Sequence, residues 1–437
     1  MNFLVLGLFA AGLVTCLIAQ VSILYALIFG YVLFFSYGLY RHLSVRELIR
    51  LSWTGIQTVR MVLIVFCLIG VITATWRASG TIPYLVYSAG RVIRPDAFLV
   101  VTFLLNSGLS LLIGTSFGTV ATMGVICMSI GNAMNYDPVW LGGAILSGIY
   151  VGDRCSPLST SALVVASITH TDLFTNLKYM AVHAAFPIIL SCIIYGVMGL
   201  SMTTSTVDTR ILDEFNQVFV LSWPVLLPAI VIIVMSILRI AVWKTMLVSI
   251  VAALGLCVFL QGLSFQDIWP MLITGYKTPD SELASMLNGG GLLSMAKPGA
   301  LVALSCSYAG IFEKTDLLTG IKKGIHHLAN WVTRYGCTII VSLGAVSIAC
   351  NQTLSSIMVQ QLCQELFSNK QEMALALEDT TIVLAALIPW SVAVAVPLAV
   401  LEVPTAAILT AVYLYLQPLC SWIYYEFLPF PLKFIRK

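Results

Sequence analysis

Long stretches without a charged side chain constrain this 437-residue chain more than any other feature. No Asp, Glu, Lys or Arg occurs before Arg41, and none lies between Asp96 and Asp137 or between Lys178 and Asp208. A helix crosses the roughly 30 Å apolar core of a bilayer with about 20 apolar residues, and its backbone groups must bond to one another there. The runs are far longer than the alternating strands of an outer-membrane barrel. The sequence therefore predicts an all-α polytopic membrane protein with about ten to twelve membrane segments, some too short to cross alone.

The composition excludes a water-soluble protein and a nucleic-acid binder. Charged residues make up 9% of the chain and hydrophobic residues 59%, whereas soluble domains carry about 25% charged residues. The net charge of +3 is too small for a nucleic-acid-binding protein. The 11 cysteines include no C-x-x-C pair, so we expect small buried side chains rather than disulfides. We expect no cofactor, and as partners the lipid bilayer and a small transported ion or organic solute; a homodimer stays open.

The distribution of basic residues predicts the orientation in the cell (inner or plasma) membrane. Residues 2–18 have no basic start and no cleavage site, so we expect a retained first span. Residues 41–60 combine arginines with apolar residues at helical spacing, which predicts an interfacial helix on the cytoplasmic side. The loop at 276–282 is not basic and is predicted to be external, whereas 314–334 and the C-terminal tail are basic and predicted to be internal. Both termini are therefore expected in the cytoplasm.

A weak internal repeat appears when the chain is shifted by about 236 residues. Gly108 then falls on Gly344, and Thr115 falls on Asn351. The matched segments 41–60 and 277–296 are predicted on opposite membrane faces, which indicates an inverted repeat of the kind found in secondary transporters. The predicted parts are N-terminal spans with the interfacial helix (1–60), a first repeat (61–202), a linker (203–215), scaffold spans (216–289), and a second repeat core with the tail (290–437).

Two polar breaks interrupt the apolar runs of the first half. Thr115 and Ser116 lie in a G-T-S-F-G-T stretch that suits an unwound helix offering carbonyls and hydroxyls to an ion, although a small-residue packing face is the alternative. The second break, at 152–161, separates two short apolar stretches and predicts the tip of a re-entrant hairpin, with a solvated loop as the alternative. Its candidate site residues are Asp153, Ser156, Pro157 and Ser159.

Two further breaks lie in the second half. Asn351 and Gln352 supply donors and acceptors in mid-span, where a hydrogen bond between helices is the alternative. The fourth break predicts a second hairpin and contains Glu378, Asp379, Thr380, Pro389 and Trp390. Paired carboxylates suit cation or proton chemistry, while an N-terminal helix cap is the alternative. We predict that Asp153 and one of Glu378 or Asp379, with Asp379 preferred, hold a transported sodium ion, and that His170 and His183 are packed or interfacial.

In order and spacing, these motifs resemble the NhaC family of sodium/proton antiporters over most of the chain. The matching stretches are G-T-S-F-G-T at 114–119, G-D-R-C-S-P-L-S at 152–159, F-E-K-T at 312–315, L-E-D at 377–379 and I-P-W at 388–390. The family is similar to the ion-transporter superfamily, which implies two inverted repeats, each with a re-entrant hairpin and a broken helix, divided between scaffold and transport domains.

The chain departs from the family pattern at four places in the expected site. Family members commonly carry Asp where Asn351 and Thr160 stand, and Asn where Leu163 and Ser391 stand. Each missing anion weakens attraction for a cation. The resemblance implies a cation-coupled sodium/proton antiporter-like exchanger that works by alternating access, and the missing charges leave coupled transport of a small organic acid or amino acid as the alternative.

An intramembrane serine hydrolase is a third hypothesis, with Ser116 as nucleophile and His183 as base. The repeat would have no role in such an enzyme. The chain also contains no H-E-x-x-H motif and no nucleotide-binding loop. We therefore expect a transporter and not an enzyme.

Overall fold

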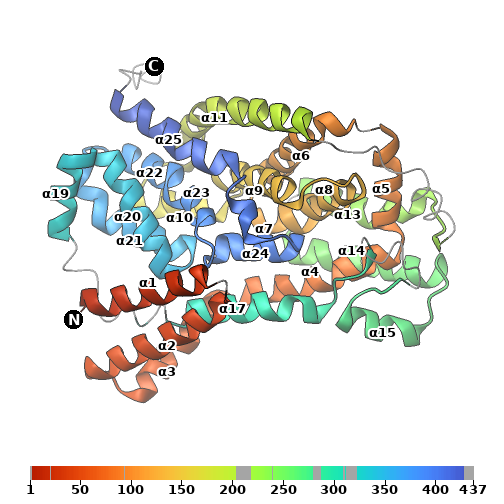
Figure 1. The fold of residues 1–437 in the computed structure, drawn as a ribbon, viewed down its shortest axis with the longest axis horizontal. Coiled ribbons are helices and arrows are strands. Elements are labelled where there is room, and N and C mark those ends of the chain that lie inside the picture. Colours follow the sequence, from red (N-terminus) through yellow and green to blue (C-terminus); the bar gives the residue numbers. More distant parts are fainter. Residues whose placement is uncertain are drawn as a thin grey trace.

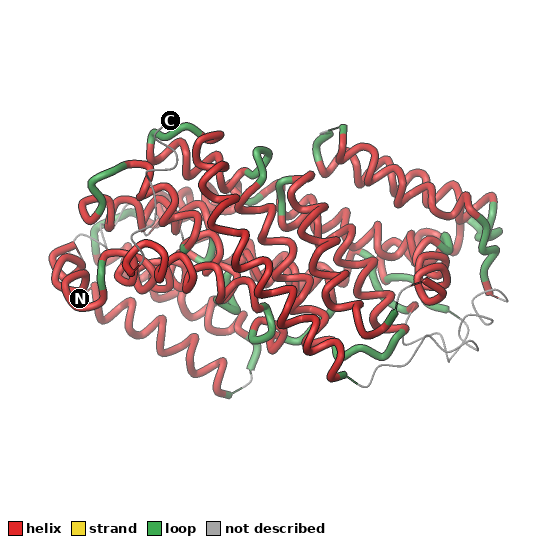
Figure 2. The backbone as a smooth tube through the Cα atoms, turned by 90° about the horizontal axis from the view of Figure 1, so that it is seen from above, coloured by secondary structure: helices red, strands yellow, loops and turns green. Residues whose placement is uncertain are grey.

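The computed structural model describes residues 2–19, 21–92, 94–202, 218–238, 240–278, 287–308, 311 and 322–427. Within these residues the chain is helical and no strand occurs apart from an isolated bridge between Tyr276 and Gly289 (Figure 2). Most of the long helices run roughly along the long axis of the molecule (Figure 1). The predicted all-α class is confirmed. The predicted linker 203–215, the motif at 312–315 and the C-terminal tail lie outside the described residues.

The described helices include several that are long and apolar enough to cross a membrane. Four qualify singly: Pro95–Ile113, Ser116–Ala133, Leu173–Ser201 and Thr405–Glu426. Two bent pairs also qualify when each pair is taken as one span: Leu63–Ala78 with Thr81–Ser88, and Lys370–Leu387 with Val392–Leu401. Several shorter apolar helices accompany them. A polytopic membrane protein is therefore supported, while the number of ten to twelve segments stays a prediction.

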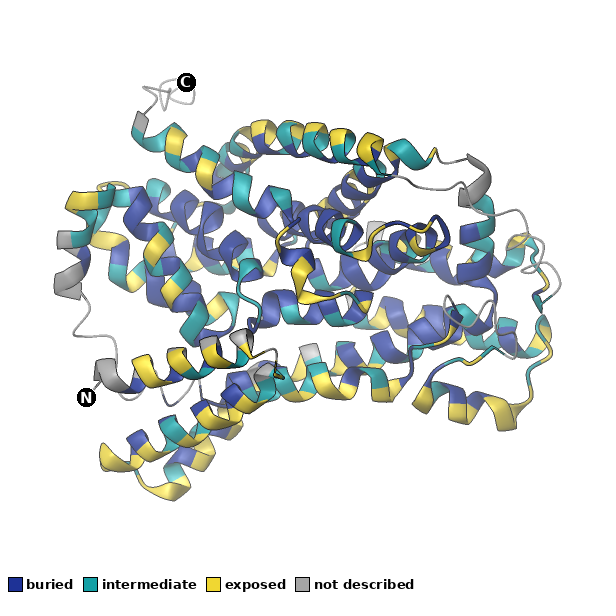
Figure 3. Cartoon of the chain, viewed as in Figure 1, coloured by how far each residue is buried: buried dark blue, intermediate teal, exposed yellow. Residues whose placement is uncertain are grey.

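Helix α11 (Leu173–Ser201) shows how the apolar surface is used. Val182, Phe186, Ile189 and Ile193 are more than half exposed and follow one another at helical spacing (Figure 3). Water would disfavour so continuous an apolar stripe, whereas lipid would not. The stripe is the face that α11 offers to the bilayer.

The elements before the first polar break form a helical pair, an amphipathic helix and a bent helix. Their bounds are α1 (Asn2–Ile18), α2 (Ile23–Tyr40), α3 (Val45–Thr58), α4 (Arg60–Ala78) and α5 (Thr81–Val92). Helix α3 starts at Ser44, whose hydroxyl accepts from the backbone N–H of Glu47, and it buries Leu48 while exposing Trp53. The amphipathic helix predicted within 41–60 is therefore present.

The elements of the second half that precede its polar breaks are again a helical pair, a short amphipathic helix and further helices. Its elements are α13 (Leu227–Ile237), α14 (Val242–Phe259), α15 (Phe265–Thr274), η4 (Leu292–Met295), α17 (Ala296–Ser307) and α19 (Lys322–Val332). Helix α15 starts at Ser264 with a capping box that involves Asp267, as α3 starts at Ser44 with Glu47 in the same position. Helix α3 packs against α17, and α15 packs against α4, so each half covers the other.

The elements around the polar breaks include two pairs of helices of equal length. In the first half they are η1 (Pro95–Ala97), α6 (Phe98–Ile113), α7 (Ser116–Thr119), η2 (Val120–Gly124), α8 (Val125–Ala133), α9 (Pro138–Cys155) and α10 (Thr160–Thr169). In the second half they are α20 (Arg334–Ala349), α21 (Gln352–Cys363), η5 (Gln364–Leu366), α22 (Lys370–Asp379), α23 (Thr381–Leu384), η6 (Ala385–Leu387), α24 (Val392–Leu401), η7 (Thr405–Ile408) and α25 (Val412–Phe427). Helices α6 and α20 have 16 residues each, and α10 and α24 have 10 each.

The structure exchanges the predicted roles of hairpin and broken helix. The side chains of Asn106 in α6 and Cys127 in α8 lie 3.6 Å apart (N to S), so the chain turns back on itself at 114–115. Thr338 at the start of α20 likewise interacts with Cys363 at the end of α21. By contrast, Lys370–Leu387 and Val392–Leu401 are bent by only 50°, which describes an interrupted helix rather than a hairpin. The hairpin predicted at the fourth break is therefore wrong in place, whereas the one predicted at the second break stays a prediction.

Backbone geometry explains the exchange. Gly114 has φ 77° and Cys350 has φ 59°, both left-handed, and the residues that follow them, Thr115 and Asn351, are extended. A left-handed residue followed by an extended one redirects the chain within two residues, as short links between antiparallel helices require. At 388–391 the chain instead becomes extended and continues in a similar direction.

Candidate functional site

Asp153 connects the two helical hairpins. Its side chain is buried near the end of α9, with Oδ1 accepting from the backbone N–H of Ser116 at 3.2 Å. Oδ2 accepts from Nε2 of Gln352 at 3.1 Å. Ser116 begins α7 and Gln352 begins α21, so a single carboxylate contacts the tip of each hairpin.

Thr115 and Asn351 serve as helix caps at those tips. The Thr115 hydroxyl accepts from the N–H of Gly118 at 3.0 Å, and Oδ1 of Asn351 accepts from the N–H of Leu354 at 2.8 Å. Both contacts satisfy backbone donors that a helix start would otherwise leave unpaired. Their predicted role as ion ligands stays a prediction.

The second break packs against the first. The Ser156 hydroxyl donates to the carbonyl of Leu111 at 2.8 Å, and the Ser159 hydroxyl donates to the carbonyl of Asp153. Pro157 between them is exposed. A Cβ at Gly114 would lie 2.6 Å from the backbone of Leu158, so the two breaks touch. The hydroxyls of Ser156 and Ser159 therefore support the turn in which they lie.

The fourth break meets the third in the same way. The N–H of Val392 donates to the carbonyl of Cys350 at 2.8 Å, and Trp390 donates from Nε1 to the carbonyl of Ser347 at 2.9 Å. Pro389 is half-buried beside them. Because the hydroxyl of Tyr150 in α9 donates to the carbonyl of Ala393 after the fourth break, all four breaks meet in one region.

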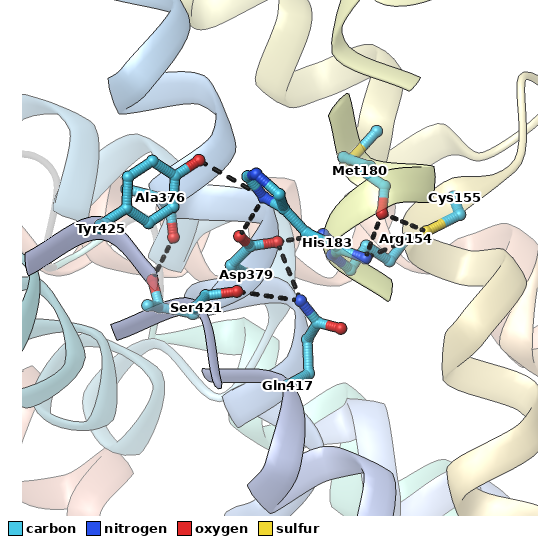
Figure 4. Close-up of polar contacts among 10 residues, drawn as sticks. Arg154, Cys155, Met180, His183, Ala376, Asp379, Gln417, Ser421 and Tyr425 are labelled. Atoms are coloured by element: carbon cyan, nitrogen blue, oxygen red, sulfur yellow. Dashed lines mark hydrogen bonds and ion pairs between the residues drawn. The ribbon is translucent and has the colours of Figure 1, made fainter. Parts of the chain in front are cut away.

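Asp379 lies in a buried ion-pair network. Its Oδ1 accepts from the guanidinium of Arg154 and from Nε2 of Gln417 at 3.3 Å, and its Oδ2 lies 3.1 Å from Nδ1 of His183 (Figure 4). Asp379 is the last residue of α22, so the alternative in which these acids cap a helix N-terminus is wrong.

Glu378 is buried without a partner. Its side chain is 0% exposed, and neither carboxylate oxygen makes a hydrogen bond in the structure. Thr380, which follows the pair, ends the helix and bonds through its hydroxyl to the carbonyl of Ala376 at 2.6 Å. Removing an ionised carboxylate from water without compensation costs several kcal/mol. Glu378 therefore requires a proton or a bound cation.

Sequence reasoning missed the side chains that α11 and α25 contribute. His183 was expected to be a packed or interfacial residue, yet it contacts both Asp379 and the hydroxyl of Tyr425, the latter at 3.4 Å. Gln417 has an unpaired oxygen beside the same network. A cavity of about 280 Å³ between α11 and α25 is lined by His183 and Ser421. The sequence gives only a weak signal for these side chains, because His183 and Gln417 interrupt apolar runs far from the motifs.

The described residues contain no group of three or more His, Cys, Asp or Glu side chains that could hold a resident metal. The site is therefore a meeting of two carboxylate centres, Asp153 and Glu378 with Asp379, at helix breaks. Sodium coordination by Asp153 and Asp379 stays a prediction.

Comparisons with known proteins agree with this architecture. The model of the Na+/H+ antiporter family matches residues 1–200 and 148–428. An uncharacterized Na(+)/H(+) antiporter of Haemophilus influenzae is 26% identical over 366 residues, 79% of this chain and 78% of the relative. The Na(+)/H(+) antiporter NhaC of Alkalihalophilus pseudofirmus is 27% identical over 338 residues, 75% and 73% of the two chains. The arginine/ornithine antiporter ArcD of Halobacterium salinarum is 26% identical over 353 residues, 77% and 71%.

The matches to the family model extend over both halves and include all four breaks. They support a transporter and not the serine hydrolase considered above, and the structure agrees because His183 bonds to Asp379 and Tyr425. The chain belongs to the Na+/H+ antiporter family and is a sodium/proton antiporter-like secondary transporter of the NhaC type.

Proposed function

We propose that sodium and protons are exchanged at the point where Asp153 joins the two hairpin tips. The contact of Asp153 with Ser116 of one half and Gln352 of the other carries this proposal. An ion bound there would be shared by both halves, so its arrival and release would change how the halves fit together. Carboxylate, carbonyl and hydroxyl oxygens at helix breaks suit a small hard cation.

Glu378 is the acid on α22 that we assign to the transported ion in this conformation. Asp379, which the sequence favoured, is already neutralised by Arg154, whereas both oxygens of Glu378 are free. A buried carboxylate with no donor attracts a proton or a sodium ion more strongly than one that is paired. Asp153 with Glu378 is therefore our preferred ion pathway.

The architecture that fits this site is an inverted repeat working by alternating access in the cell membrane. The corresponding lengths of α6 and α20 and of α10 and α24 support it, as does the reciprocal packing of α3 with α17 and α15 with α4. Hairpins whose tips meet inside the molecule would be re-entrant, entering and leaving on one face. Both termini are proposed to be cytoplasmic.

Transport of an organic acid or amino acid is the second candidate. The site lacks the acids that the family commonly carries where Asn351 and Thr160 stand, and the similar protein ArcD is an arginine/ornithine antiporter. A more neutral site binds cations less tightly and offers donors to an anionic group.

Proteoliposome flux separates these candidates and tests Asp153. With imposed sodium and proton gradients and no organic solute, we expect sodium/proton exchange in the wild type and its loss in Asp153→Asn, with membrane insertion intact. Asp137→Asn is the matched control, because Asp137 caps the other end of α9 and Asn caps equally well. Unchanged pH and sodium dependence in Asp153→Asn would refute the assignment. Flux that starts only after an amino or carboxylic acid is added would favour the second candidate.

A further inference from the structure

Arg154, Glu378 and Asp379 form a buried group with two acids and one base. All three side chains are 0% exposed. The Arg154 guanidinium bonds to Asp379 and, at 3.3 Å, to the carbonyl of Met180, but its Nε has no acceptor. Glu378 has two acceptor oxygens without a donor. A free donor and two free acceptors thus coexist among fully buried side chains.

The positions of the three residues favour exchange of partners. Glu378 and Asp379 are consecutive at the end of α22, and Arg154 is the next-to-last residue of α9. Glu378 interacts electrostatically with Arg154, Asp379 and Asp153. Successive helical residues point about 100° apart, and of the two acids the guanidinium bonds in this structure to Asp379 and not to Glu378.

We propose that Arg154 is an internal cation that moves between Asp379 and Glu378 during transport. The proposal rests on the exchange function proposed above and specifies how the site would allow only one ion at a time. With Arg154 on Asp379, as in this structure, Glu378 takes the proton or sodium ion. When Arg154 moves to Glu378, that ion is expelled, and Asp379 becomes the acid that awaits a cation.

Asp379 has partners other than Arg154, so its buried carboxylate is stabilised whether Arg154 bonds to Asp379 or to Glu378. Nδ1 of His183 and Nε2 of Gln417 contact its two oxygens, so its carboxylate keeps partners when Arg154 leaves. The other titratable and charged groups that face the three residues are Asp153 and Cys155 from α9, Tyr335 from α20, and Tyr413, Tyr424 and Tyr425 from α25. None of the groups just named carries a positive charge. The cationic groups beside the two acids are Arg154 and, when it is protonated, His183.

Infrared difference spectroscopy of the full-length protein in lipid nanodiscs tests the movement. In sodium-free buffer we expect a protonated-carboxyl band from Glu378, which disappears in Glu378→Gln. In Asp379→Asn the same band should also disappear, because Arg154 would then pair with Glu378 and ionise it. Glu372→Gln is the control, since Glu372 pairs with the partly exposed Arg334 and its removal should leave the band unchanged.

Several outcomes would overturn the inference. A Glu378 band that persists in Asp379→Asn means that Arg154 does not move, and a wild-type spectrum with no band lost in Glu378→Gln means that Glu378 is not the free acid. If Asp379→Asn does not fold, His183→Phe replaces it, because Asp379 then loses a partner that holds it once Arg154 leaves, so Arg154 should stay on Asp379 and the Glu378 band should be at least as strong as in the wild type. A weaker band in that variant also overturns the inference. The spectra need no flux, so they decide on Arg154 even if the exchange experiment fails.

Discussion

Asn351 occupies a position where a carboxylate would serve the fold as well as the amide does. Its φ of −143° and ψ of 153° are those of an extended cap residue, and its side chain accepts from the N–H of Leu354. Asp and Asn are about equally good in this role, and a negative charge is favoured at the start of α21. Its neighbour Gln352 contacts Asp153, so a negative charge at position 351 would change the electrostatic potential around Asp153.

The double variant Asn351→Asp with Thr160→Asp should therefore fold and bind sodium more tightly. Each ionised acid adds roughly 1 kcal/mol of attraction or more at an effective dielectric near 20, which raises affinity by at least about fivefold. A sodium/proton antiporter would keep its turnover with a shifted sodium dependence. A transporter of organic solutes would lose substrate binding, because donors have become acceptors. Sodium-dependent flux with and without candidate solutes measures both effects.

Asn351→Ala is the control for this change. It removes the cap and should cost about 1 kcal/mol of stability without raising sodium affinity. If the double variant and the wild type share one sodium dependence, charge at these positions does not govern cation binding.

Single residues also show where sequence reasoning ends. Asp153 and Gln352 were identified because polar side chains inside apolar runs demand an explanation. His183 was not, because its partner Asp379 lies 196 positions away and only the tertiary fold brings the two together. The pairing of Arg154 with Asp379 is equally invisible to local patterns.

The contact between α6 and α9 depends on glycines in α9. A Cβ on Gly152 would lie 2.0 Å from the backbone carbonyl carbon of Ser110, and backbone cannot yield to it. Gly108 in α6 is the opposite case, with no atom within 4 Å of an added Cβ. Small residues let helices approach closely in a membrane, and only one of these two is needed for that purpose.

Gly152→Ala should consequently destabilise the protein by about 1–3 kcal/mol or more, since overpacking a core usually costs that much. Gly108→Ala should be neutral or should stabilise α6 by up to about 1 kcal/mol, since Ala is the better helix former. Thermal unfolding of both variants in detergent provides the comparison. Equal melting temperatures would mean that α6 and α9 separate more readily than the packing indicates.

At the scale of elements, the sequence located the breaks but not their geometry. Glycine, hydroxyl and amide residues inside apolar runs indicated that helices end near 114, 156, 351 and 388, and helices do end there. Whether the chain then reverses depends on the left-handed backbone of Gly114 and Cys350. Cys350 gives no warning of it, because a non-glycine residue adopts that conformation only under tertiary constraint.

The whole molecule is organised as two halves that resemble each other in element order. The helix pairs α1–α2 and α13–α14 are each followed by a short amphipathic helix, α3 or α15, with the same serine-and-acid start. Figure 1 places α3 and α15 at opposite ends of the long axis, along which most of the long helices run. If that axis is the membrane normal, the two amphipathic helices lie on opposite membrane faces.

Site-directed labelling decides whether the repeat is inverted. Arg46 and Gln266 are the second residues of α3 and α15, and both are exposed. A membrane-impermeant maleimide should label Gln266→Cys in intact cells, whereas Arg46→Cys should react only after the membrane is opened. The unmodified chain gives the background of its native cysteines, of which Cys67 on α4 is exposed. Labelling of both variants from one side would contradict the inverted repeat. It would also remove the inverted symmetry by which the two halves could exchange their packing between inward-open and outward-open states.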